Sequence, residues 1–418
     1  MFRYIDIRSY FPKIGFAFRA LKSRNYMLFF VGQSISLMGT FIQNLALGWL
    51  VYRLTSSSFL LGAVGFAGQI PSLFLTPFAG VFADRLNRRK VLIATQTLSM
   101  LMAFLLVGLY ETDSIKIWHI IVISVINGFS LAFDTPFRHA FIIEMVGDKE
   151  LLQNAIALNS TLINSARFIG PTIGGFLIAW LGEGACFIIN GVSFMAVIGS
   201  LMAMRIVPLN RGSHRSGIVR ELLEGLQYSY HAKTIWYLLL LVAMFGFLGL
   251  PFQIFLPVFA RDILHGSSQT LGFLTGAFGA GALLGAFYLA SRKSVCSLPK
   301  IILMSSMLFA VGLLGFSVSS NIILSLSIIF VLGFGMVSLF AGTNTLLQQI
   351  VDDDKRGRVV ALYGMSFMGI TPLGSLLLGS ITPLLGVQIT FVVAAGLCLV
   401  AAFAFSKKLP TVKTDVCG

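Results

Sequence analysis

The sequence predicts an all-α membrane protein with twelve transmembrane helices in two pseudo-symmetric six-helix bundles. Three observations predict this fold. First, 56% of the 418 residues are hydrophobic and only 11% are charged, whereas a soluble domain carries about 25% charged residues. Second, apolar stretches long enough to cross about 30 Å of hydrocarbon recur along the whole chain. Third, the charged residues gather in the short segments between these stretches.

The predicted spans follow one another with short connections except at one place. Each span is an apolar stretch of about the 20 residues that a helix needs to cross a bilayer. The longest connection, 206–234, separates a first bundle at 27–205 from a second at 235–406, and 407–418 form a tail. The spans lie at 27–52, 60–82, 91–110, 117–138, 156–181, 184–205, 235–259, 270–291, 299–318, 321–347, 359–384 and 386–406.

The segment before the first span and the long connection are both expected to contain amphipathic helices. Residues 1–26 place apolar residues at helical spacing opposite cations, which favours an interfacial helix. A partly ordered basic tail is the alternative. Within the connection, residues 217–232 are expected to form an amphipathic helix that packs under the bundles. Its apolar stripe consists of Leu222, Leu223, Leu226 and Tyr230.

The cations are distributed unevenly between the two sides of the predicted membrane. Of the 30 Lys and Arg residues, three (Arg53, Lys116 and Arg261) fall in loops on one side and Arg167 falls inside a span. The others lie on the opposite side, including four in the hairpin at 85–90. Because Lys and Arg favour the cytoplasmic side, we expect a plasma-membrane protein with both termini in the cytoplasm.

The net charge of +14 does not indicate a nucleic-acid partner, because the cations lie in separate loops. Anionic membrane lipid is the expected partner. The five histidines and four cysteines are scattered, so we expect no metal site. No nucleophile–base pair is recognisable within the spans, and we therefore expect no enzyme.

The two predicted bundles share a sequence pattern. The sequence GPTIG at 170–174 in span five recurs as TPLG at 371–374 in span eleven. Paired six-helix bundles with a long connection are typical of transporters, in which the bundles rock about a site near the bilayer midplane.

The chain resembles the major facilitator superfamily over essentially its whole length. The sequence GVFADRLNRR at 80–89 matches the signature hairpin between spans two and three. Segments 39–55 and 159–175 are similar to the drug:proton antiporter branch that includes macrolide and siderophore exporters. The resemblance implies a monomer in a bacterial inner membrane. It also implies alternating access driven by the proton gradient, without a cofactor.

The resemblance also implies a gate on the cytoplasmic side. Asp84 would accept backbone N–H groups from the start of span eleven, near Arg358, and would hold that side closed. Arg85, Arg88 and Arg89 would extend this latch. The alternative is a basic loop that only orients the protein, with Asp84 as a helix cap.

Three charged residues are candidates for coupling and binding within the spans. Arg167 lies near the bilayer middle, where an arginine costs roughly 2.5–3.5 kcal/mol on insertion scales. It is expected to line a cavity and pair with Asp134 or an anionic substrate, or else to bond backbone carbonyls as a structural residue. Asp134 and Arg138 share a helix face at the cytoplasmic end of span four. Asp134 is the proton-coupling candidate, with a fixed salt bridge, or coupling at Glu111 and Asp113, as alternatives.

A proline and three glycines follow Arg167. Proline bends a helix and glycine lets neighbouring helices approach closely. The pattern Gly170, Pro171, Gly174 and Gly175 resembles an antiporter signature of exporters. Kinked packing without meaning for transport is the alternative.

Polar amides and aromatic residues in the spans are candidates for the substrate cavity, because an amide in lipid is costly unless it faces a pocket or another helix. Each could equally serve helix packing. The candidates are Gln33, Gln43, Asn44, Trp49, Asn127, Phe133, Asn164, Arg167, Trp236, Gln253, Asn344 and Gln348.

The expected function is secondary active export of small amphipathic organic molecules by proton-coupled antiport. One alternative keeps the fold and exports a siderophore or another acidic metabolite. A second is a lipid or lysolipid flippase. A remote alternative is a transport-inactive membrane sensor or scaffold.

Overall fold

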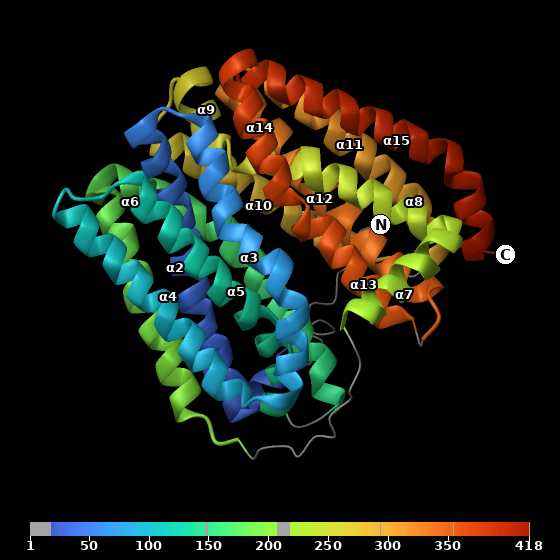
Figure 1. Cartoon of the computed structure of the whole chain (residues 1–418), viewed down its shortest axis with the longest axis horizontal. Coiled ribbons are helices and arrows are strands. Elements are labelled where there is room, and N and C mark those ends of the chain that lie inside the picture. The colour runs from blue at the N-terminus through green and yellow to red at the C-terminus, as the bar shows by residue number, and fades with distance from the viewer. Residues whose placement is uncertain (1–17, 147–148, 207–217, 293, 354, 418) are drawn as a thin grey trace, which may run out of the picture.

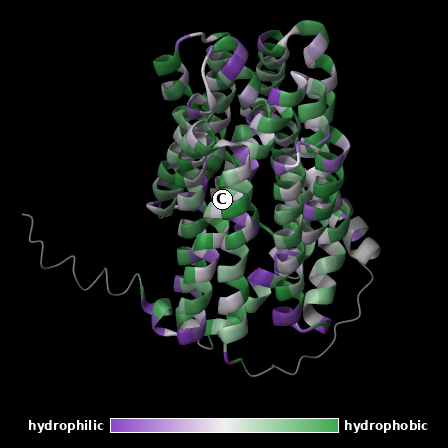
Figure 2. Ribbon diagram, turned by 90° about the vertical axis from the view of Figure 1, so that its left-hand side faces the viewer, coloured by the Kyte–Doolittle hydropathy of each residue, from purple (hydrophilic) through white to green (hydrophobic). Residues whose placement is uncertain are grey.

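The computed structural model describes residues 18–146, 149–206, 218–292, 294–353 and 355–417. Nearly all of them are helical, which confirms the predicted all-α membrane fold. Apolar residues cover the helices along most of their length, and many hydrophilic residues lie toward the two ends of the molecule (Figure 2). Within the described residues, eleven helical segments are long and apolar enough to cross a membrane.

The first half of the chain forms five long helices after a short 3-10 turn at Arg19–Lys22. Their bounds are α2 (Arg24–Thr55), α3 (Ser58–Arg85), α4 (Arg88–Glu111), α5 (Ile117–Val146) and α6 (Lys149–Ala203). The side chains of Ser57 and Asn87 cap the starts of α3 and α4 by accepting backbone N–H bonds, as capping residues do.

Helix α6 contains two spans. Its 55 residues would reach about 80 Å at 1.5 Å per residue, far more than a bilayer. The helical conformation is interrupted at Gly182, whose φ of 79° and ψ of 173° suit a residue without Cβ. The chain therefore reverses at Gly182, and eleven apolar segments make twelve crossings.

The second half begins with α7 and continues through spans that are less regular than those of the first half. One of them contains both π-helical and 3-10 turns, and another contains a π-helical turn. The bounds are α7 (Ile218–His231), α8 (Lys233–Met244), η3 (Phe245–Gly249), η4 (Leu250–Gln253), α9 (Leu256–Val258), η5 (Phe259–Ile263), α10 (Ser268–Ala290), η6 (Val295–Ser297), α11 (Leu298–Val318), α12 (Ile322–Ile350), α13 (Arg356–Gly364), η7 (Met365–Gly369), α14 (Thr371–Leu385) and α15 (Val387–Cys417).

Proline accounts for the irregular spans. Pro251 and Pro257 interrupt the span from α8 to η5, and Pro372 follows the π-helical turn between α13 and α14. A proline removes one backbone donor and displaces the preceding turn of the helix. Wider or tighter turns keep the remaining carbonyls bonded, as a membrane requires.

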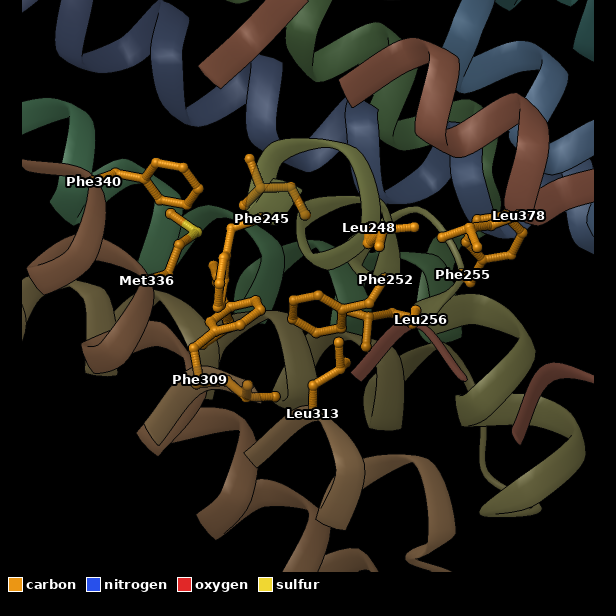
Figure 3. Close-up of a cluster of buried hydrophobic side chains, with 14 of the residues drawn as sticks. Phe245, Leu248, Phe252, Phe255, Leu256, Phe309, Leu313, Met336, Phe340 and Leu378 are labelled. Atoms are coloured by element: carbon orange, nitrogen blue, oxygen red, sulfur yellow. The ribbon is translucent and has the colours of Figure 1, made fainter. Parts of the chain in front are cut away.

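A cluster of aromatic rings packs the second half together (Figure 3). The Phe252 ring lies 6.1 Å from that of Phe309, which lies 5.7 Å from Phe245, each pair close to edge-on. Such contacts matter here because lipid is as apolar as a side chain, so association within a bilayer depends on close packing. The cluster joins the α8–η5 span to α11 and α12.

The two halves share a core at one end of the molecule and not at the other. We call the end where α3 joins α4 the basic end, and the other end the opposite end. Buried residues at the opposite end of the first half, such as Leu50, Leu106 and Phe187, belong to one core with the second half. Those at its basic end, such as Phe29 and Phe141, form a separate core. Figure 1 shows the helices spreading apart toward the side where α7 and α13 lie.

The connecting helix α7 packs on the second half through a different face from the one predicted. Ser229 is fully buried, and a Cβ added at Gly225 would lie against the Cβ of Arg358 in α13. Leu226 and Tyr230 of the predicted apolar stripe are exposed. A small-residue face therefore contacts α13, and Leu226 and Tyr230 point away from it. The side chains of Leu222 and Leu223 lie outside the described part of the structure.

Candidate functional site

One stripe of α6 changes from exposed to buried along its length. Ser160, Asn164 and Arg167 recur at helical spacing and remain at least partly exposed. Pro171 and Ile178 continue the same stripe toward the opposite end and are buried. The stripe is therefore covered by neighbouring helices beyond Arg167 and is left at least partly uncovered toward the basic end.

Glycines make the closure between the halves. A Cβ added at Gly272 of α10 would lie 2.9 Å from the Pro171 carbonyl oxygen of α6. One added at Gly62 of α3 would lie 2.4 Å from the Ser375 carbonyl oxygen of α14. Both distances are shorter than a Cβ allows, so only glycine permits these backbones to touch. Thus α6 of the first half meets α10 of the second backbone to backbone, and α3 meets α14 in the same way.

Arg167 points into the wedge between the two halves. Gly170 and Gly174 of α6 contact α2, while Thr172 faces Gly276 of α10. At 3.6 residues per turn Arg167 lies between these two faces. Its side chain therefore enters the space bounded by α2 of the first half and α10 of the second.

The guanidinium of Arg167 has no hydrogen-bond or ion-pair partner among the residues that the structure describes. Its nitrogens are not sealed from solvent either, since the residue is only partly buried. The predicted pairing with Asp134 is absent within the described chain.

Asp134 is instead bonded within the first half. Its carboxylate accepts a 2.6 Å bond from Gln96 of α4 and lies 3.4 Å from the Arg138 guanidinium. Thr95 contributes a 3.4 Å bond. Asp134 and Arg138 lie well inside α5, because that helix continues past Pro136 to Val146. The predicted placement of both residues at the end of span four, near residue 138, was wrong because the helix is longer than the predicted span.

Arg88, predicted to extend a gate, joins helices of the first half. It is buried, donates 2.8 Å and 2.7 Å bonds to the carbonyls of Ala83 and Ala140, and pairs with Glu144 at 3.1 Å. Glu144 was not singled out from the sequence. An acid in the last turns of α5, opposite a basic hairpin, is the signal that could have indicated it.

The other predicted gate residues are separated from one another. Arg89 donates a 2.6 Å bond to the Met202 carbonyl, and Arg85 is exposed. Asp84 lies in the last turn of α3, and its side chain is outside the described part of the structure. The gate stays a prediction, because the basic ends of the two halves lie apart in this conformation.

Arg358 belongs to the connection between α7 and α13. Its guanidinium pairs with Glu224 at 3.0 Å, and Tyr228 donates a 3.0 Å bond to Asp352. These contacts hold the connecting helix against the second half.

A second contact between the halves lies at the opposite end, and no local sequence pattern indicates it. The Tyr52 hydroxyl at the end of α2 donates to the Asp262 carboxylate in η5. The Arg261 guanidinium lies 5.8 Å from the Tyr52 ring and bonds its carbonyl at 3.5 Å. This cluster bridges the halves where they are closed.

The first half has a matching cluster that does not cross to the second. Glu183, buried just after the reversal in α6, pairs with Arg53 at 2.8 Å and accepts a 3.0 Å bond from Tyr110. It ties the ends of α2 and α4 to the reversal within α6.

Replacing Tyr52 with phenylalanine should loosen the closed end. The change removes one hydrogen bond, worth about 1 kcal/mol. That energy corresponds to a roughly fivefold change in the ratio of closed to open conformations. We expect spin labels at Leu54→Cys and Gln269→Cys to show a larger population at long distance. Tyr110→Phe is the matched control, because its bond stays within the first half. Equal distance distributions for Tyr52→Phe and the unchanged protein would contradict the prediction.

Several predicted cavity residues are used for helix packing or lie near a helix end. Asn190 donates a 2.9 Å bond to Gln43, so Gln43 joins α2 to α6. Helix α8 begins at Lys233, so Trp236 lies in its first turn. The Trp236 ring is 5.5 Å from the Tyr230 ring. Gln348 bonds Asn344 at 3.2 Å near the basic end of α12.

The remaining cavity candidates are less clearly assigned. Gln33 is buried, and Asn44 is exposed. The side-chain oxygen of Asn127 is buried without a described partner. Partly buried positions are found for Trp49, Phe133, Asn164 and Gln253.

Comparison with known proteins identifies the family. A single family model, described as transmembrane secretion effector, matches residues 16–417. The chain belongs to this family. It is a family of the major facilitator superfamily, whose members are transporters and not enzymes, as the sequence predicted.

The relatives of this family member include named transport proteins. The chain is 26% identical to the staphyloferrin A transporter of Staphylococcus aureus over 93% of its own length and 97% of the relative's. It is 22% identical to macrolide efflux protein A of Streptococcus pyogenes, over 89% and 92%. It is 24% identical to the multidrug efflux pump Tap of Mycolicibacterium fortuitum, over 84% and 88%.

Solved structures of major facilitator transporters share the fold. The nucleoside transporter NupG matches with a TM-score of 0.69 at 16% identity, over 93% of this chain and 98% of that one. A bacterial homologue of the lysosomal transporter Spinster, described as inward-facing and unoccupied, matches with a TM-score of 0.73 at 13% identity, over 94% and 99%.

Proposed function

We propose that this family member is a secondary active exporter of small amphipathic organic molecules. It works by alternating access with proton antiport, in a bacterial inner membrane with both termini in the cytoplasm. The basic end then faces the cytoplasm, in agreement with the preference of Lys and Arg for that side.

The observation that carries this proposal is the asymmetry of the contact between the halves. The halves meet backbone to backbone at the opposite end, and the stripe of α6 around Arg167 is open toward the basic end. Two bundles that seal a midplane site from one side only are suited to alternating access. Cargo would enter from the cytoplasm in this conformation and leave after the halves rock.

The relatives support export over uptake. Two of them are named as efflux proteins, for macrolides and for several drugs, and a third is named as a transporter of staphyloferrin A. Because the chain aligns with nearly their whole length, the comparison covers both halves of the transport machinery.

The proposal is tested in proteoliposomes made with the purified full chain. The probes are a radiolabelled macrolide and the amphipathic fluorophore N-dansylglycine, each corrected for leak into protein-free liposomes. We expect an acid-inside pH gradient to drive uptake of at least one probe, and nigericin to stop it. Uptake that persists after the gradient collapses would refute antiport. Uptake of neither probe in either condition would count against this substrate range.

Asp134 is the coupling residue of the proposal, so Asp134→Asn should separate binding from coupling. Asparagine keeps an oxygen for Gln96 and fills the same space, but it cannot bind or release a proton. We expect probe binding to persist and uptake driven by the pH gradient to fall to the leak rate. The control is Asp353→Asn, an exposed acid outside the spans. Undiminished gradient-driven uptake in Asp134→Asn would remove Asp134 from the coupling mechanism.

A further inference from the structure

The space between the halves contains a charge that the protein does not balance. Arg167 lies halfway along its span, where Gly279 at the middle of α10 approaches its backbone oxygen. Its guanidinium has no partner among the described residues, and its nitrogens remain accessible. A guanidinium stays protonated in proteins, so in this position it needs water or an anionic ligand beside it, which could reach it from the basic end.

Among the side chains that the structure describes, the other charged groups within the spans do not compensate Arg167. The Asp134 carboxylate already pairs with Arg138 on its own helix and accepts a hydrogen bond from Gln96. Elsewhere Arg88 pairs with Glu144, and Arg53 pairs with Glu183. Each of these groups is balanced within the first half, so the positive charge at Arg167 is left for a mobile anion.

We propose that Arg167 binds a carboxylate of the cargo, so that the transported molecules are amphipathic organic acids. The proposal rests on the exporter function above and specifies its substrate class. A guanidinium presents two parallel N–H donors that match the two oxygens of a carboxylate. Asn164 lies one helical turn away on the same stripe, and its amide nitrogen already donates a 2.9 Å bond to the Ser160 carbonyl.

The same charge connects loading to the closing of the cavity. When the basic ends come together, water leaves the space around Arg167, and an unpaired cation becomes costly in the dry interior. A bound carboxylate removes most of that cost. The loaded carrier therefore closes more readily than one that carries neither cargo nor another anion.

The test compares two probes that differ only in charge. N-dansylglycine carries a carboxylate, and N-dansylglycinamide carries a neutral amide at the same position. Fluorescence titration of the purified full chain measures binding without requiring transport. We expect the acid to bind at least about tenfold more tightly than the amide, as a charged hydrogen-bonded pair provides.

Three variants show whether Arg167 causes the difference. Arg167→Gln, which is polar but neutral and shorter, should bind both probes equally. Arg167→Lys keeps the charge without the two parallel donors and should retain part of the preference. Arg292→Gln, which removes an exposed cation beyond the end of α10, should leave the preference unchanged. Size-exclusion profiles identify any variant that has not folded, and the comparison of probes on the unchanged protein needs no variant.

The outcomes separate this inference from the exporter proposal. Equal binding of both probes to the unchanged protein, or an undiminished preference for the acid in Arg167→Gln, would overturn the role of Arg167. In proteoliposomes, transport of the amide as fast as the acid would overturn the substrate class and leave the exporter intact. Tight and selective binding of the acid with no transport of either probe would support the binding site and count against export.

Discussion

Gly272→Leu is expected to abolish transport while leaving the protein folded. Gly272 of α10 touches Gly175 of α6, so that a Cβ at 272 would lie 3.0 Å from the Gly175 Cα and 2.9 Å from a backbone oxygen. Backbone cannot move aside as a flexible side chain can. A leucine therefore holds α6 and α10 apart, and the closed end cannot seal.

The expected readouts are loss of gradient-driven uptake and a shift of the spin-label pair at Leu54→Cys and Gln269→Cys to long distance. Gly396→Leu is the matched control, because nothing lies within 4 Å of the Cβ position at Gly396 in α15. Normal transport by Gly272→Leu would show that the glycine contact is not part of the cycle.

Arg88→Ala is expected to destabilise the first half by about 3–5 kcal/mol, the usual effect of breaking a buried ion pair. The side chain is buried and bonds two backbone carbonyls and Glu144 at once. Alanine leaves these acceptors without their charged donor. The measurement is thermal unfolding in detergent, together with the amount of folded protein recovered from membranes.

Arg89→Ala is the control for Arg88→Ala. Arg89 makes a described bond to a single carbonyl, that of Met202, so its removal should cost about 1 kcal/mol. Arg88→Lys should fall between the two, since an ammonium keeps the charge but cannot span three acceptors. Equal unfolding temperatures for Arg88→Ala and Arg89→Ala would contradict a structural role for Arg88.

The fold was predictable because a bilayer imposes simple rules on sequence. Local composition indicates where each span begins and ends and where the chain reverses near Gly182. The positions of the cations indicate on which side each loop lies. The unusual position of Arg167 was also evident, because an ionisable residue inside an apolar stretch is rare. These features need no knowledge of which helix lies beside which.

The pairing of distant residues was not predictable in the same way. Tyr52 and Asp262 are 210 positions apart, and nothing in either local sequence indicates the other. Asn190 bonds Gln43 from another span, so an amide expected in the cavity serves packing instead. Which face of α7 is buried likewise depends on the shape of α13 and not on the hydrophobic pattern of α7 itself.

The single-residue reversal at Gly182 has a mechanical consequence for the first half. The span that carries Arg167 continues without a loop into the span that carries Glu183 and Asn190, and both of these side chains are bonded to α2. A tilt of one of these two spans must therefore be transmitted to the other and to α2, because no flexible loop separates the two spans. Such a connection favours motion of the first half as one rigid body over independent bending of its helices.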